Sequence, residues 1–287
     1  MGPNGSPTNS IPLAAEMTPS DDVAISAREN PLAWRGPVGR IALALVPILC
    51  LFLAWELTVR LGLMKAALLS PPSVAIPALI AYFTSGEIFP HLWASLQRGG
   101  AGFLIAAVVG VPLGLIIGSL KPVSRALTPI IEFLRQLPPL AMLPVFLLFL
   151  GLGFRAQLAI VIWASIWPIL LNTITGAQSV DPRLVKAART LGAKRGDLFL
   201  KVALPSSLPT IMTGIRIALG AGWSTLVAAE LIAATRGLGF MIQSASQFLV
   251  TDLVVAGILV VALVALLFEI GLRRLQQRFS PWLGRMS

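Results

Sequence analysis

Residues 181–205, DPRLVKAARTLGAKRGDLFLKVALP, are the most informative stretch of this 287-residue sequence. Asp181 is a residue type that caps helix N-termini, and Pro182 is favoured just inside the first turn. Gly192 is typical of a helix C-terminus, so the stretch predicts two short helices joined at this glycine. The first helix has one apolar and one basic face, because apolar residues recur at i, i+3, i+4 and i+7: Leu184, Ala187, Ala188 and Leu191.

A small amphipathic helix of this kind has two ordinary uses at the surface of a membrane protein. It lies on the lipid surface, or it docks into a groove of another protein. A plain connecting loop has no need of an apolar face. The residues by themselves leave both uses open.

The composition around this stretch is that of an integral membrane protein. Hydrophobic residues make up 56% of the chain and charged residues only 12%, whereas a soluble domain carries roughly 25% charged residues. The mean hydropathy of +0.85 agrees. These values exclude a soluble enzyme, and they exclude disorder for most of the length.

Six apolar stretches approach the roughly 20 residues that a membrane-spanning helix needs. We expect an all-α protein with six spans at residues 41–59, 94–120, 127–150, 157–178, 208–233 and 252–272. Glycines in the second span suit close helix packing, and prolines 138, 139 and 144 break the third. Residues 1–36 are expected to be a disordered cytoplasmic tail, and residues 37–287 a six-span domain.

The basic residues orient the chain. Of the 22 Lys and Arg residues, fifteen fall on the side of the N-terminal tail, the 121–125 loop, the 179–207 segment and the C-terminus. Four fall on the opposite side, and three lie within or at the edges of spans. Cytoplasmic loops are enriched in Lys and Arg, so both termini and the 179–207 segment are predicted to be cytoplasmic. Nucleic acid is not an expected partner, because no basic stretch is interleaved with stacking aromatics.

The sequence offers little material for catalysis. One cysteine, Cys50, and one histidine, His91, exclude a disulfide framework and multi-histidine metal chemistry. No GxxxxGK[ST] loop is present to cradle phosphates. We therefore expect no metal, no bound cofactor and no enzymatic activity in this chain, and an intramembrane enzyme would need a polar cluster that the sequence lacks.

Residues 186–205, KAARTLGAKRGDLFLKVALP, resemble the coupling-helix motif of ABC importer permeases. That motif is Glu-Ala-Ala, three residues, Gly, nine residues, Ile, one residue and Leu-Pro. The matching positions, which the resemblance assigns to ATPase coupling, are Lys186, Ala187, Ala188, Gly192, Val202, Leu204 and Pro205. Lysine stands here in place of the glutamate and valine in place of the isoleucine. Lys186 therefore carries a positive charge where the motif carries a negative one.

The resemblance extends from Pro71 to the C-terminus. Pro138-Pro139-Leu140 and residues 222–245, GWSTLVAAELIAATRGLGFMIQSA, are similar to the taurine, sulfonate and nitrate/bicarbonate permease group, with the taurine permeases most similar. It implies a type I importer permease fold in the bacterial inner membrane. It also implies three partners: a second copy of the chain, two cytoplasmic ATPase subunits that use ATP and Mg²⁺, and a periplasmic or lipid-anchored binding protein. Taurine or a related sulfonate is the expected substrate, with nitrate or bicarbonate as the alternative.

Ionisable residues at bilayer depth are costly, so each needs a reason. Glu132 and Arg135 are three residues apart and can neutralise each other on one helix face. Glu230, near the outer end of the fifth span, and Arg236 are candidates for a gate or a binding-protein contact. The candidates for the translocation pathway are Arg216, Trp223, Ser224, Thr225, Asn172 and Trp167, although each also has a structural interpretation. A proton-driven transporter is a further alternative, supported only by Glu230.

Overall fold

The computed structural model describes residues 2, 37–65 and 69–279, and every regular element in these residues is helical. The tail expected at residues 1–36 lies outside the described residues, except for Gly2. The chain divides into two units, Met1–Ala54 and Trp55–Ser287. α2 (Pro37–Arg60) begins in the described part of the first unit. It contains residues 41–59, the first expected span.

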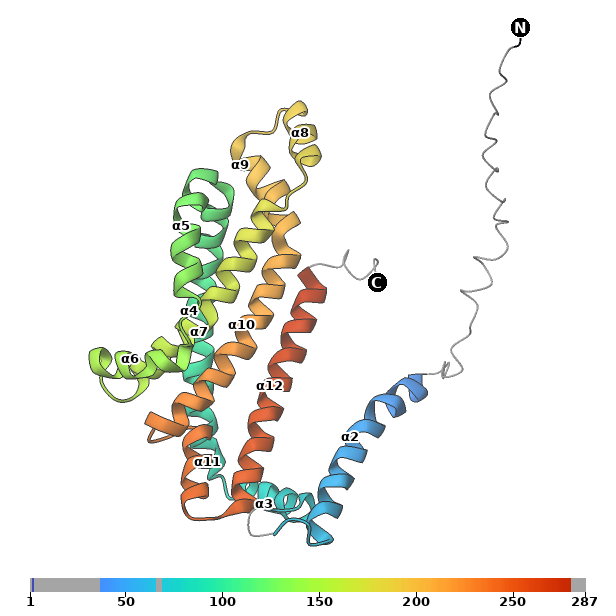
Figure 1. Ribbon diagram of the computed structural model, residues 1–287, viewed down its shortest axis with the longest axis vertical. Helices are drawn as coiled ribbons and strands as arrows, with labels where there is room; N and C mark the ends of the chain where they lie inside the picture. The colour runs from blue at the N-terminus through green and yellow to red at the C-terminus, as the bar shows by residue number, and fades with distance from the viewer. Residues whose placement is uncertain (1, 3–36, 66–68, 280–287) are drawn as a thin grey trace. The chain divides into compact units, whose positions relative to one another are not determined.

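Four helices of the second unit are long and apolar enough to span a membrane. They are α4 (Ile88–Ser119), α7 (Phe154–Gln178), α10 (Leu204–Ala233) and α12 (Thr251–Phe279). They run side by side in Figure 1, and they contain the second, fourth, fifth and sixth spans expected from the sequence. With one broken span added, the described residues supply up to five such crossings, so the expected number of six is not confirmed.

The broken span is the third expected one. α5 (Lys121–Leu134) is followed by a 3₁₀ turn (Pro139–Met142) and by α6 (Leu143–Leu150). The two halves meet at an angle of 83°, and Figure 1 shows α6 projecting sideways from the other helices. Proline removes a helical N–H donor and its ring clashes with the preceding turn, so Pro138 and Pro139 account for the break at this point.

Small residues allow α4 and α7 to pack closely. Gly102, Ala106, Gly110, Gly114 and Gly118 recur every four residues along one buried face of α4. An added Cβ at Gly114 would lie 2.6 Å from the Cβ of Thr173 on α7. The prediction that the glycines of the second span serve helix packing is confirmed for this face. α7 also packs along α10 and is therefore central in the second unit.

Two connections between the expected spans contain helices of their own. α3 (Pro72–Thr84) begins immediately after Pro71, and α11 (Leu238–Gln247) follows Gly237. Both are shorter than a membrane span and lie at the same end of the second unit (Figure 1). Glu56, in the last turns of α2, accepts hydrogen bonds from the Ser73 hydroxyl at 2.7 Å and the Ser73 amide at 3.1 Å. This contact anchors the start of α3.

Candidate functional site

The segment between α7 and α10 forms the helices predicted from the sequence. α8 (Pro182–Thr190) is capped by Asp181, whose carboxylate accepts a hydrogen bond from the Arg183 amide at 2.8 Å. Gly192 then adopts a φ of +82°, a left-handed conformation that favours glycine. α9 (Arg195–Leu198) follows and continues through a π-helical turn (Phe199–Ala203) into α10. The predicted pair of short helices joined at Gly192 is confirmed.

The residues of the coupling motif surround this turn. Lys186, Ala187 and Ala188 lie on α8, Val202 lies in the π-helical turn, and Leu204 and Pro205 open α10. Ala188, Gly192 and Val202 line a hollow of about 310 Å³ together with Leu191. The part of the chain that the structure describes leaves this apolar face largely uncovered, since Leu184 is 51% and Leu191 88% exposed. Tertiary folding leaves this face available to another surface.

The opposite end of the second unit carries a buried polar cluster. The Glu230 side chain of α10 is fully buried and forms an ion pair of 2.8 Å with the Arg98 guanidinium of α4. The Ser95 hydroxyl lies 2.9 and 2.7 Å from the two Glu230 oxygens, and the Gly239 amide donates to the carboxylate at 3.0 Å. Among the described residues, the groups that bond to the Glu230 carboxylate therefore come from α4 and from the start of α11.

The loop before α11 is held by the same face of α4. Arg98 donates to the backbone carbonyl of Arg236 at 2.6 Å, and the Leu238 amide donates to the Ser95 hydroxyl at 2.8 Å. His91 Nδ1 lies 3.2 Å from the nitrogen and 3.1 Å from the oxygen of Gly237, so it accepts or donates according to its tautomer. His91 lies in the first turn of α4.

Glu230 and Arg236, the two sequence candidates for a gate or a binding-protein contact, lie in different surroundings. The Glu230 carboxylate is closed to solvent and bonded to Arg98, whereas the Arg236 side chain is exposed and only its carbonyl takes part. Arg98 is one of the three basic residues that lie within or at the edges of the expected spans, and neither it nor Ser95 was among the predicted site residues. A signal was present, because His91, Ser95 and Arg98 are spaced i, i+4 and i+7 and share one helix face.

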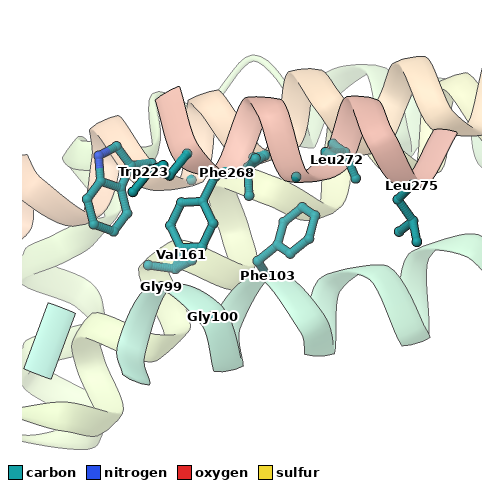
Figure 2. Close-up of a pocket in the computed structure, with 12 residues that line it drawn as sticks. Gly99, Gly100, Phe103, Val161, Trp223, Phe268, Leu272 and Leu275 are labelled. Atoms are coloured by element: carbon teal, nitrogen blue, oxygen red, sulfur yellow. The ribbon is translucent and has the colours of Figure 1, made fainter. Parts of the chain in front are cut away.

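Two candidate pathway residues, Trp223 and Arg216, lie near each other on α10. Trp223 is 7% exposed, donates from Nε1 to the Val261 carbonyl at 3.2 Å, and packs edge-to-face on Phe268 of α12. Figure 2 shows its ring beside an apolar cavity of about 310 Å³ between α4, α7, α10 and α12. Arg216 forms an ion pair with Glu269 of α12. Both side chains therefore make contacts between α10 and α12.

The other candidates are Ser224 and Thr225, which follow Trp223 on α10, and Trp167 and Asn172 of α7. Ser224 is exposed and Thr225 half-buried. Trp167 of α7 packs edge-to-face on Trp163, with ring centroids 5.0 Å apart. Asn172 donates from its amide to the Pro168 carbonyl in its own helix at 2.8 Å. Glu132 and Arg135 approach to 3.9 Å, in agreement with the pairing expected from their spacing.

The sequence matches a known family model across residues 110–281, which is more than half of the chain. The family is described as the binding-protein-dependent transport system inner membrane component. This chain belongs to that family. It is therefore a permease subunit of an ABC importer, a multi-pass inner-membrane protein. Such permeases are transport components rather than enzymes, and they work with ATPase and substrate-binding partners.

Alignments with two named relatives cover most of this chain. It is 42% identical over 262 residues to the taurine transport system permease protein TauC of Escherichia coli K12, covering 89% of this chain and 95% of that one. It is 32% identical over 267 residues to the bicarbonate transport system permease protein CmpB of Synechocystis, with the same two shares. Its fold is similar to that of a chain of the inward-facing MetNI methionine ABC transporter, with a TM-score of 0.57, 17% identity, and coverage of 65% of this chain and 93% of that chain.

Proposed function

We propose that this permease carries taurine or a related small sulfonate across the inner membrane. The observation that carries the proposal is the 42% identity to the taurine permease TauC, which extends over 95% of that protein. The second candidate is a small inorganic anion such as bicarbonate or nitrate, favoured by the 32% identity to the bicarbonate permease CmpB. Both substrate classes carry a compact anionic group.

We infer that the chain pairs with a second copy of itself and spans the membrane six times, with both termini in the cytoplasm. The orientation rests on the fifteen basic residues of one side against four of the other. It places α8 in the cytoplasm, at the end where two ATPase subunits would bind. The Arg98–Glu230 cluster then lies at the periplasmic end, where a binding protein would deliver the substrate.

The 179–207 segment is the proposed coupling segment. α8 presents Leu184 and Leu191 to solvent, and an apolar face of a short amphipathic helix suits a groove in a partner protein. Closure of the ATPase dimer on ATP would move the two α8 helices and, through the continuous α9–α10 connection, the membrane helices. ATP and Mg²⁺ would be bound by the partner subunits.

Labelled-taurine uptake tests the substrate. Uptake is measured in host cells that lack the gene and in the same cells complemented with it, with unlabelled alkanesulfonate, nitrate and bicarbonate as competitors. We expect uptake only in complemented cells, with competition by sulfonates alone. Uptake that is unchanged by deletion of the gene would remove taurine as the substrate, and the competing anions would then be tested directly.

Co-purification of an ATP-hydrolysing subunit tests the coupling segment and separates an ABC permease from a proton-driven transporter. We expect Ala188→Asp and Gly192→Asp to abolish association, because each places a carboxylate in the hollow beside α8. Gly196→Asp is the matched control, since Gly196 has a negative φ and nothing within 4 Å of its added Cβ. Intact association in the first two variants would show that α8 does not dock to the ATPase.

A further inference from the structure

Another cavity lies on the other side of α8 from the hollow that Ala188, Gly192 and Val202 line. It has a volume of about 760 Å³ and is bordered by the ends of α4 and α7, the first turn of α5 and one side of α8. Gly118 and Ser119 end α4, and Ala177 and Gln178 end α7. Since α4 and α7 are membrane spans, the cavity lies where the bilayer meets water.

Four cationic side chains from two helices line this cavity. Lys121 and Arg125 come from α5, and Lys186 and Arg189 come from α8. None of the lining residues is acidic, and none of these four cations has a carboxylate within 4.0 Å among the described residues. Four like charges around one cavity repel one another, and an anion between them would relieve that repulsion.

The cavity is also lined by neutral polar side chains that are held in place by a hydrogen bond. The Gln178 amide donates to the buried Ser124 hydroxyl at 2.9 Å, which joins the end of α7 to α5. This hydrogen bond anchors the start of α5 to the end of α7. Lys121 and Arg125 therefore lie on an anchored helix rather than on a loop. Arginine and lysine are the residues that bind phosphate, arginine through a planar pair of donors.

We propose that this cavity binds the phosphate of an anionic phospholipid headgroup. Its volume lies in the range of small-molecule sites and exceeds the size of a bare phosphate, which favours a headgroup with its glycerol. Basic pockets between membrane helices on the cytoplasmic side bind phospholipid headgroups in other proteins. Free inorganic phosphate offers the same chemistry, and the experiment distinguishes the two sources. A bound headgroup would join α5 to α8 and so support the position of the coupling segment.

The test measures binding to the full-length permease purified in neutral detergent. Native mass spectrometry counts bound phosphatidylglycerol and phosphatidylcholine, and inorganic phosphate is added as a competitor. The test pair is Lys121→Gln/Arg125→Gln. The matched control is Arg273→Gln/Arg274→Gln, which removes the same charge from the exposed surface of α12. Ser119→Trp is a second variant that fills the cavity and leaves the charge unchanged.

We expect at least tenfold preference for phosphatidylglycerol over phosphatidylcholine. Loss of two basic groups should weaken binding by about 30-fold, which corresponds to about 2 kcal/mol at 1.4 kcal/mol per tenfold change. Ser119→Trp should weaken binding similarly, and the control pair by less than about threefold. If millimolar inorganic phosphate by itself displaces the lipid, the site belongs to a soluble phosphate. If inorganic phosphate does not compete, the site belongs to lipid.

Two results would overturn the proposal. Equal weakening by the test and control pairs would show a general attraction of surface charge rather than a site. If binding of the ATPase subunit displaces the lipid, an acidic side chain of that partner would be the group that occupies the cavity. Both readouts are independent of the transported substrate, so the proposal can fail while the taurine assignment stands.

Discussion

The Arg98 guanidinium and the Glu230 carboxylate are 132 residues apart in sequence and form an ion pair of 2.8 Å inside the protein. Arg98 is 8% and Glu230 0% exposed. The pair joins α4 to α10, and Arg98 also binds the carbonyl of Arg236 in the loop that leads to α11. One arginine therefore connects three parts of the end of the bundle that we assign to the periplasm.

Removal of Arg98 should strongly destabilise the protein, because it leaves a buried carboxylate without its countercharge. We expect Arg98→Met to lower the free energy of unfolding by about 3–5 kcal/mol, measured by reversible unfolding in mixed micelles. Arg98→Met/Glu230→Gln should recover most of the loss. Arg236→Met is the control, since that side chain is exposed, and it should cost less than about 1 kcal/mol. A similar cost for Arg98→Met and Arg236→Met would contradict this account of the cluster.

The Ser95 hydroxyl should matter out of proportion to its size. It faces both Glu230 oxygens and accepts the Leu238 amide at 2.8 Å. Ser95→Ala leaves these buried groups with one partner fewer, and we expect it to lower the free energy of unfolding by about 1–3 kcal/mol. Ser85→Ala at the exposed end of α3 serves as the comparison, and a loss of equal size there would argue against the buried hydroxyl as the cause.

Two glycines of α4 should respond in opposite ways to alanine. The added methyl of Gly114→Ala would meet the Thr173 side chain of α7 at 2.6 Å, and such overpacking costs about 1–3 kcal/mol. No atom of the described residues lies within 4 Å of a Cβ added at Gly100, so Gly100→Ala should stabilise the helix by up to about 1 kcal/mol. Thermal unfolding of the two purified variants in detergent checks the contrast. Equal shifts would mean that α4 and α7 do not meet along this face.

Variants of the Arg216–Glu269 pair distinguish a structural role of Arg216 from a role in the substrate pathway. Loss of either charge alone leaves the other unpaired in a membrane helix, which is costly, so we expect Arg216→Gln and Glu269→Gln each to lower the amount of folded permease in membranes. The neutral double variant should restore that amount and keep taurine uptake per molecule close to wild type. An abundant double variant without uptake would instead assign the Arg216 charge to the substrate pathway.

Local patterns in the sequence were enough to determine the class and much of the helical structure. The low charge and the long apolar stretches predicted an all-helical membrane protein, and α4, α7, α10 and α12 lie where those stretches do. Asp181, Pro182 and Gly192 predicted the α8 turn, because capping and left-handed backbone geometry depend only on neighbouring residues. The coupling motif likewise occupies one continuous segment, and its spacing indicated the family.

Only the tertiary structure decided which distant groups meet. Folding buries Glu230 of α10 against Arg98 and Ser95 of α4, a contact that the sequence did not predict. Arg216 forms an ion pair with Glu269 of α12, although both side chains are partly exposed, and basic groups of α5 and α8 line one cavity. Helix periodicity fixes which residues share a face, but the partner of that face depends on how whole helices cross. An unpaired charge is costly in the low-dielectric interior of a protein, so each buried charge needs a partner of opposite sign. That partner is set by the tertiary fold.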